Sequence, residues 1–246
     1  MASRREVDCT IHRKNRRNAS AGIEDGFLAL RLSCARASSC GRRFPDGMHV
    51  RSFIFSTIHE GNVMALKIAV VVGSLRRDSF NKQLAHALAS LAPSDFSFDF
   101  VDIGGLPLYS QDYDSDFPEV ARAFKQQIAD ADGLLIVTPE YNRSMPGVLK
   151  NALDWASRPW GQSVWGGKPG AIIGTSVGAI GTAIAQSHLR GVCAYLDIVL
   201  MNQPEMYIKH DESRIDANGN IVSEDTRKYL QTFMDKYAAW VRDRAV

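Results

Sequence analysis

The chain has 246 residues, of which 45% are hydrophobic and 23% are charged, and this is enough for one α/β domain with a substantial core. No run approaches the roughly 20 apolar residues of a membrane-spanning helix, and the four cysteines form neither a Cys-x-x-Cys pair nor a zinc-binding spacing. We therefore expect a soluble, cytoplasmic protein without a metal site, a disulfide framework or a membrane partner.

Charge is divided unevenly along the chain. Residues 1–63 carry 11 Lys and Arg against 6 Asp and Glu, a net charge of +5, whereas the remainder carries 18 against 21, a net charge of −3. The first segment has no sustained amphipathic period, so we interpret it as a basic, poorly ordered extension. Met64 directly precedes the first predicted strand, and the simplest hypothesis is that residues 1–63 come from an over-extended gene model. The alternatives are an inert or targeting tail, or a basic tail with another role; the tail lacks the interleaved aromatics and modules of nucleic-acid binding.

Residues 64–246 alternate between strand-like and helix-like patterns. The predicted strands span residues 67–73, 97–102, 133–137, 171–175 and 198–201, and the predicted helices span residues 81–92, 118–131, 146–157, 181–194 and 224–244. Five strands that alternate with five helices predict a doubly wound α/β fold with a parallel sheet. Ligands of such sheets bind at the carboxyl ends of the strands, so we expect the loops after the first, third and fourth strands to meet.

The loop after the first strand has the composition of an anion site. Residues 73–81 read Gly-Ser-Leu-Arg-Arg-Asp-Ser-Phe-Asn, and the N-terminus of the next helix favours negative charge here. Ser74, Ser79 and Asn81 add neutral donors, and Arg76 or Arg77 can add charge-assisted hydrogen bonds. The loop lacks the Gly-Lys-Ser/Thr of a P-loop and the three glycines of a dinucleotide fingerprint, so it suits the terminal phosphate of a mononucleotide such as FMN. The alternative is an ordinary turn with Asn81 as the helix N-cap.

Two further loops can bind a flat ring. Residues 138–147 read Thr-Pro-Glu-Tyr-Asn-Arg-Ser-Met-Pro-Gly, in which prolines stiffen the chain and Tyr141 offers an aromatic face. In residues 175–182, glycines allow a ligand to approach the backbone, and Ser176 can donate a hydrogen bond to a flavin. Each of these loops, taken alone, is also compatible with an ordinary turn.

Residues 73–81, 138–142 and 144–155 together resemble the NADPH-dependent FMN reductase family, above all its bacterial chromate, quinone and azo reductase members. The resemblance spans nearly all of residues 66–246, in order, and implies a flavodoxin-like sheet of five strands. It implies FMN as the cofactor and NADPH or NADH as the co-substrate. The residues implied to bind FMN are Ser74, Arg76, Ser79 and Asn81 at the phosphate, and Pro139, Glu140, Tyr141, Asn142, Ser176 and Gly178 around the ring.

The resemblance also implies an activity, namely reduction of a quinone, chromate, an azo compound or free flavin by NAD(P)H. The two half-reactions would follow one another through FMN, and no residue is assigned as catalytic because flavin N5 carries the hydride. One alternative is a flavodoxin-type electron carrier without NAD(P)H turnover, although carriers tend to be more acidic than a net charge of −3. Another is a non-catalytic binding protein that uses the same fold.

One position departs from the family's pattern. Members often carry an arginine shortly after the glycines of the loop at residues 175–182, where this chain has Ile184, and this leaves the contact to the nicotinamide phosphate open. The resemblance further implies a homodimer or homotetramer. Trp155, Trp160 and Trp165 are interpreted as packing or subunit-interface residues, and His188 as structural or interfacial. Exposed aromatic residues near Trp160 and Trp165 are expected at such an interface.

Overall fold

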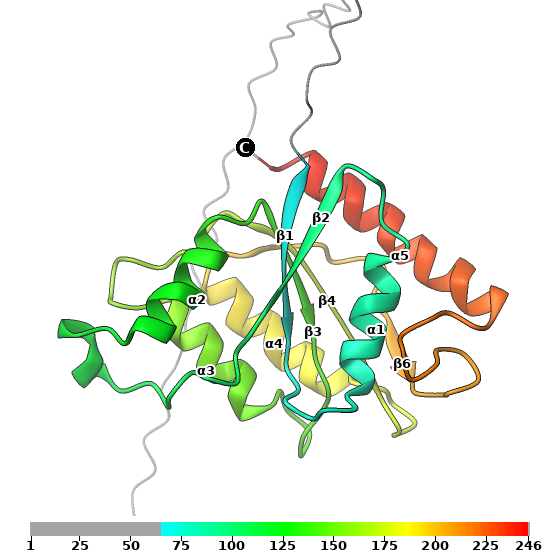
Figure 1. Ribbon diagram of the computed structural model, residues 1–246, viewed down its shortest axis with the longest axis horizontal. Coiled ribbons are helices and arrows are strands. Elements are labelled where there is room, and N and C mark those ends of the chain that lie inside the picture. Colours follow the sequence, from blue (N-terminus) through cyan, green and yellow to red (C-terminus); the bar gives the residue numbers. More distant parts are fainter. Residues whose placement is uncertain (1–64, 246) are drawn as a thin grey trace, which may run out of the picture. The chain divides into compact units, whose positions relative to one another are not determined.

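The structure, a computed structural model, describes residues 65–245, so the predictions for residues 1–63 lie outside the described residues. In chain order the elements are β1 (Leu66–Val72), α1 (Phe80–Ala89), β2 (Phe96–Val101), the short 3-10 helix η1 (Gln111–Ser115), α2 (Glu119–Ala129), β3 (Gly133–Val137), α3 (Gly147–Ala156), β4 (Pro169–Ser176), α4 (Ala183–Tyr195), β5 (Val199–Leu200), β6 (Tyr207–Lys209) and α5 (Glu224–Arg242) (Figure 1). Among these residues, no helix is both long and apolar enough to cross a bilayer.

The strands pair in parallel in the order β2-β1-β3-β4-β5, which is the flavodoxin-like order and confirms the predicted fold class. The far edge of the sheet differs from the prediction. The fifth strand pairs only with the start of β4, and a further strand, β6, pairs with its end, from Gly174 to Ser176. The predicted strand at residues 198–201 corresponds to β5 alone, and β6 was not predicted.

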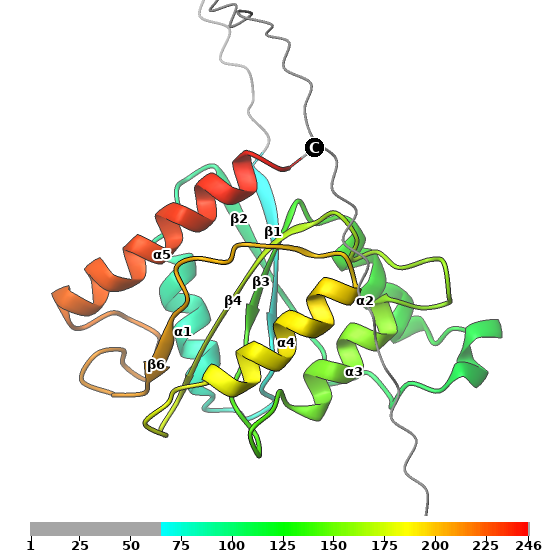
Figure 2. The ribbon, with the colours of Figure 1, turned by 180° about the vertical axis from the view of Figure 1, so that it is seen from behind.

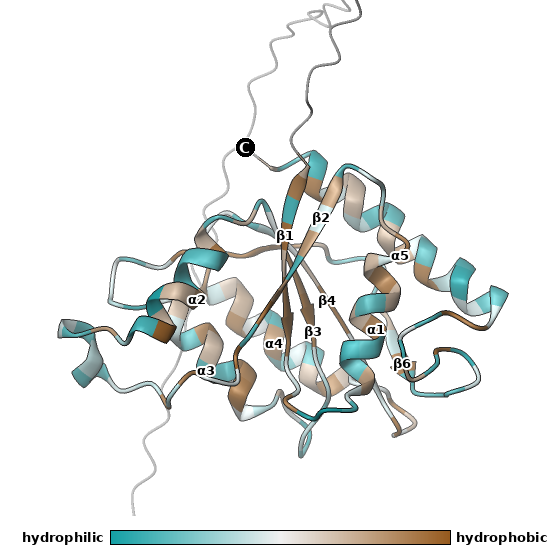
Figure 3. Cartoon of the chain, in the orientation of Figure 1, coloured by the Kyte–Doolittle hydropathy of each residue, from teal (hydrophilic) through white to brown (hydrophobic). Residues whose placement is uncertain are grey.

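Helices cover both faces of the sheet, and each of the three central strands buries both of its faces. Ile68 and Val70 of β1 pack toward α1 and α5, whereas Ala69 and Val71 pack toward α2, α3 and α4. Figure 2 shows α3 and α4 on the side away from α1. The central strands are mostly brown in Figure 3, and the helices carry teal residues on their outward sides. This explains why the strands were predictable from continuous apolar runs.

Two of the tryptophans belong to the core. Trp155 and Trp165 are fully buried, and their indole N–H groups donate to the carbonyls of Pro107 (2.7 Å) and Leu153 (2.9 Å). Of the two expected roles, packing holds for Trp155 and Trp165, and Trp165 does not contribute to an exposed aromatic surface. Trp160 is 74% exposed, as an interface residue would be in a single protomer.

Candidate functional site

The three loops expected to meet do so at the carboxyl edge of the sheet. The loops after β1, β3 and β4 lie along the lower edge of the ribbon in Figure 1. The Gly73 N–H donates to the carbonyl of Val137 (2.9 Å), and the Thr138 N–H donates to the carbonyl of Ile173 (3.0 Å), so each loop leaves the sheet beside the next. The parallel order β1-β3-β4 thus assembles segments that are far apart in the sequence.

At the first loop, the N-terminus of α1 is open to a ligand. Ser79 is the N-cap, and its hydroxyl accepts a hydrogen bond from the Lys82 N–H (3.3 Å). Within residues 65–245, the backbone N–H groups of Phe80 and Asn81 have no hydrogen-bond partner, and neither has the Ser74 hydroxyl. The loop therefore presents unpaired donors where the helix dipole favours an anion.

Asn81 has a different role from the one expected of it. Its side-chain amide donates to the carbonyl of Thr175 (2.9 Å), and its amide oxygen accepts from the Thr175 N–H (3.0 Å). This pair is buried and joins the start of α1 to the end of β4, 94 residues away. The Asn81 side chain is committed to the backbone of β4, so only its own N–H remains for an anion.

Arg76 lies over an aromatic stack that sequence reasoning missed. Its guanidinium carbon is 4.3 Å from the centre of the Phe80 ring, and that ring stacks on His210 with the ring centres 3.5 Å apart. The backbone N–H of His210 in turn donates to the carbonyl of Ser176 (2.8 Å). Burial lowers the pKa of the His210 imidazole. The stack depends on the position of β6, and nothing in the local sequence predicted that strand.

The loop after β3 contains a tight turn with unusual backbone angles. Tyr141 and Ser144 exchange two backbone hydrogen bonds (2.9 and 3.0 Å), and both residues between them adopt positive φ, 50° at Asn142 and 65° at Arg143. Such angles in residues other than glycine are strained and cluster at binding sites. The turn leaves Tyr141 53% exposed, which places its ring where a flat ligand can reach it.

Glu140 fastens this loop to α4. One of its carboxylate oxygens accepts hydrogen bonds from the N–H groups of Ile184 (3.0 Å) and Ala185 (3.1 Å) in the first turn of the helix. Its side chain is 9% exposed, and Thr182, the N-cap residue, makes no side-chain cap bond of its own. Glu140 therefore supplies the helix cap from another loop, and its charge complements the positive end of the helix dipole.

The side chain of Ser176 holds the loop after β4 in a tight turn. The Ser176 hydroxyl donates to the carbonyl of Gly181 (2.6 Å) and accepts from the Gly178 N–H (3.2 Å). Gly181 has a φ of +60°, and a Cβ there would lie 2.7 Å from the backbone of Tyr207, so the turn requires glycine. A hollow of about 380 Å³ lies between this loop and the pair Glu140 and Arg143. Because the Ser176 proton is used within the loop, its hydroxyl can only accept from a ligand.

Comparison with protein families identifies the family to which the chain belongs. Residues 66–213 match the family model described as NADPH-dependent FMN reductase. The chain belongs to this family. Membership makes it an oxidoreductase that uses FMN together with NAD(P)H. Within residues 65–245, no group of three or more His, Cys, Asp and Glu side chains is placed to hold a metal ion.

Relatives of this FMN reductase chain match over nearly their whole length. A quinone reductase of Pseudomonas putida is 48% identical over 181 residues, which are 73% of this chain and 97% of the relative. An NAD(P)H-dependent FMN reductase of Pseudomonas aeruginosa is 43% identical over 178 residues, 72% of this chain and 96% of the relative. Among solved structures, the flavoenzyme NAD(P)H:(acceptor) oxidoreductase FerB of Paracoccus denitrificans superposes with a TM-score of 0.71 at 43% identity, covering 74% of this chain and all of that one.

Proposed function

We propose that the chain is an NAD(P)H:quinone oxidoreductase that holds FMN across the three loops at the carboxyl edge of the sheet and also reduces chromate, azo compounds or free flavin. The observation that carries the proposal is the meeting of these loops, with unpaired helix N–H groups at one end and an exposed tyrosine beside an open hollow at the other. Quinone reduction is favoured because, of the relatives named above, one is a quinone reductase and another is an NAD(P)H:(acceptor) oxidoreductase.

The donors of the first loop fit a phosphate. In this proposal the N–H groups of Phe80 and Asn81 and the hydroxyls of Ser74 and Ser79 bind its oxygens, and Arg76 adds a positive charge at the rim. The Asn81 side chain positions this loop against β4 through its two bonds to Thr175. A phosphate with several free oxygens suits this mixture of backbone, hydroxyl and guanidinium donors.

The other two loops fit a flat, partly polar ring. In this proposal Tyr141 would cover one side of the ring, and the backbone between Pro139 and Asn142 would bind its polar edge. Ser176 and Gly178 border the hollow on the opposite loop, where the Ser176 hydroxyl accepts but does not donate. Glu140 keeps the two loops at a constant separation because it is bonded to the start of α4.

The side chains of this site bind and orient, and we assign none of them as an acid or a nucleophile. When bound, FMN supplies the redox centre that takes a hydride from NAD(P)H and passes two electrons to the acceptor. Both substrates reach the same open hollow in this proposal, so they bind in turn, and bulk solvent supplies the product's protons. Cys193 takes no part, because burial in α4 raises the pKa of its thiol to about 12.

Oxidation of NADPH and NADH by the purified, FMN-loaded protein, with and without 1,4-benzoquinone, tests the proposal. We expect rapid turnover that depends on the quinone. FMN that stays bound while neither nucleotide is oxidised would contradict the proposal and indicate an electron carrier. A protein that retains no flavin would contradict both the oxidoreductase and the electron carrier, and it would indicate a non-catalytic use of the fold.

We also propose that the protein forms a homodimer or homotetramer. Trp160 and Tyr195 are 74% and 75% exposed and flank a hollow of about 350 Å³ at the end of α4. Exposed aromatic side chains beside a concavity are typical of interface cores. Localisation in the cytoplasm stays a prediction from the sequence.

A further inference from the structure

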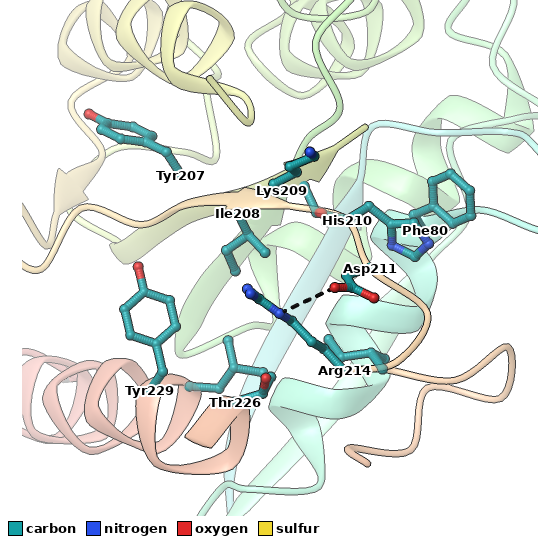
Figure 4. A pocket seen from close by; sticks show the side chains of 12 residues that line it. Phe80, Tyr207, Ile208, Lys209, His210, Asp211, Arg214, Thr226 and Tyr229 are labelled. Atoms are coloured by element: carbon teal, nitrogen blue, oxygen red, sulfur yellow. Dashed lines mark ion pairs between the residues drawn. The ribbon is translucent and has the colours of Figure 1, made fainter. Parts of the chain in front are cut away.

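A second cavity lies on the face of the sheet that α1 and α5 cover, and it shares Phe80 with the phosphate end of the proposed flavin site. It has a volume of about 290 Å³ and is enclosed by the start of α1, the end of β4, β6, the segment after β6 and α5 (Figure 4). Thr175 belongs to this cavity, whereas the next residue, Ser176, belongs to the flavin loop, because successive side chains of a strand point to opposite faces. The proposed quinone reductase activity makes no use of this space.

Two buried polar atoms in the cavity wall lack partners within the described residues. They are the hydroxyl oxygen of Thr175 and Nε2 of His210. Thr175 is only 2% exposed, and its backbone groups are both bound by Asn81, so the hydroxyl is the one polar atom it has left. A buried polar group without a partner is unfavourable and needs an explanation, which a ligand with a hydrogen-bonding group would provide.

The rest of the wall combines apolar and aromatic side chains with Thr226 and the charged residues Lys209, Asp211 and Arg214. Ile208, Ile215 and Leu230 line the cavity, together with the half-exposed ring of Tyr229. Figure 4 shows the Arg214 side chain reaching across the cavity between Asp211 and Tyr229. Its Nε lies 3.6 Å from the Asp211 carboxylate, and this is a loose pair that leaves the remaining guanidinium N–H groups free for another anion.

Arg214 is the group in the lining that can bind an anionic ligand. Lys209 and Arg214 are positive and Asp211 is negative, and burial lowers the pKa of the His210 imidazole. Figure 4 shows that Lys209 leaves β6 on the side away from Arg214, so Arg214 is the cation that faces the cavity. One positive group, an aromatic wall and two inner polar atoms together define the ligand's chemistry.

We propose that this cavity is a second binding site for a single-ring aromatic carboxylate that carries a hydroxyl group. The ring packs between Tyr229 and the aliphatic wall, the carboxylate binds Arg214, and the hydroxyl binds Thr175 and His210. A volume of about 290 Å³ accommodates one substituted ring. The site stands on these contacts and does not depend on the proposed reductase activity.

Isothermal titration calorimetry of the full-length, FMN-loaded protein with 4-hydroxybenzoate tests the site. We expect saturable binding of one molecule per chain, and binding at least tenfold weaker for 4-hydroxybenzyl alcohol, which lacks the carboxylate. The Arg214→Gln variant should lose about tenfold in affinity. Arg227→Gln is the matched control, because Arg227 is a similarly exposed arginine of α5 that pairs with Glu224 and does not line the cavity.

A second variant tests the polar end of the cavity. Thr175→Val removes the hydroxyl with little change of shape, so it should weaken 4-hydroxybenzoate about tenfold and leave benzoate binding unchanged. Equal affinities for wild type and Arg214→Gln would overturn the proposal, as would competition between the acid and benzoquinone for turnover, which would place the acid in the flavin hollow. Absence of binding by every probe would also overturn it, and the two polar atoms would then be solvated by water only.

Discussion

Arg76 and Arg77 are neighbours in the sequence but differ in what surrounds them. Arg76 is held over the Phe80 ring at the first residue of α1, next to the unpaired N–H groups. Arg77 has a side chain that is 93% exposed and pairs only with Asp78, at 3.7 Å. The cation–π contact places one of the two charges at the proposed phosphate, and the local sequence alone does not say which.

Arg76→Ala should therefore weaken FMN binding, and Arg77→Ala should not. The lost charge-assisted interaction amounts to about 1–3 kcal/mol, which corresponds to roughly 5- to 150-fold in the dissociation constant. Fluorescence titration of the apoprotein with FMN measures it. Equal losses in the two variants would show that only net charge matters and that the contact with Phe80 does not select Arg76.

Asn81→Ala should destabilise the apoprotein as well as weaken FMN binding. The substitution leaves the Thr175 N–H and carbonyl buried without partners, at about 1–3 kcal/mol for each group. Urea unfolding of the apoprotein measures the loss, with Asn218→Ala as the control because the Asn218 side chain is exposed at a hairpin tip and makes no hydrogen bond to residues 65–245. A stable apoprotein that has lost only FMN affinity would instead support Asn81 as a direct phosphate ligand.

At the scale of elements, Glu140 connects the loop after β3 to the N-terminus of α4. The carboxylate contributes both a helix cap and a charge at the positive end of the dipole. Glu140 thus fixes the loop to α4, and this also stabilises the strained turn at Asn142 and Arg143.

Glu140→Ala should lower the free energy of unfolding by about 1–2 kcal/mol, and Glu140→Gln should recover part of this loss because the amide oxygen still accepts. Urea unfolding gives the free energy, and hydrogen exchange of the peptide that contains residues 139–146 reports on the loop. Glu119→Ala is the control, because Glu119 lies in the first turn of α2 but is exposed and makes no bond to the backbone. Equal behaviour of the two alanine variants would contradict the capping role.

The elements themselves were predictable to the extent that their signals are local. The apolar runs of β1 and β3, the prolines before α2 and α3 and the donor-rich loop at residues 73–81 each depend on neighbouring residues, and the structure has each element where it was predicted. The roles of Asn81 and Glu140 depend on partners 94 and 44 residues away. Such partners are set by the packing of the whole sheet, so no local pattern indicates them.

At the scale of the whole molecule, the exposed aromatic residues Trp160 and Tyr195 mark the surface that we propose as the interface between protomers. In solution we expect a mass of two or four protomers, measured by light scattering after size-exclusion chromatography. Trp160→Ser should shift the distribution toward the protomer, because an aromatic side chain at the centre of an interface contributes much of its affinity. Val222→Ser, which changes an exposed apolar residue before α5, is the control. A monomeric wild type would contradict the proposed assembly.

The end of β4 separates the two proposed sites by a single peptide unit. The Thr175 carbonyl belongs to the same peptide as the Ser176 nitrogen, and Asn81 holds that carbonyl from the helix that would bind the FMN phosphate. An aromatic acid that draws the Thr175 hydroxyl toward itself therefore acts on the peptide from which the flavin loop starts. Occupancy of the two sites would then be heterotropically linked, and by reciprocity FMN would change the affinity for the acid by the same factor by which the acid changes the affinity for FMN.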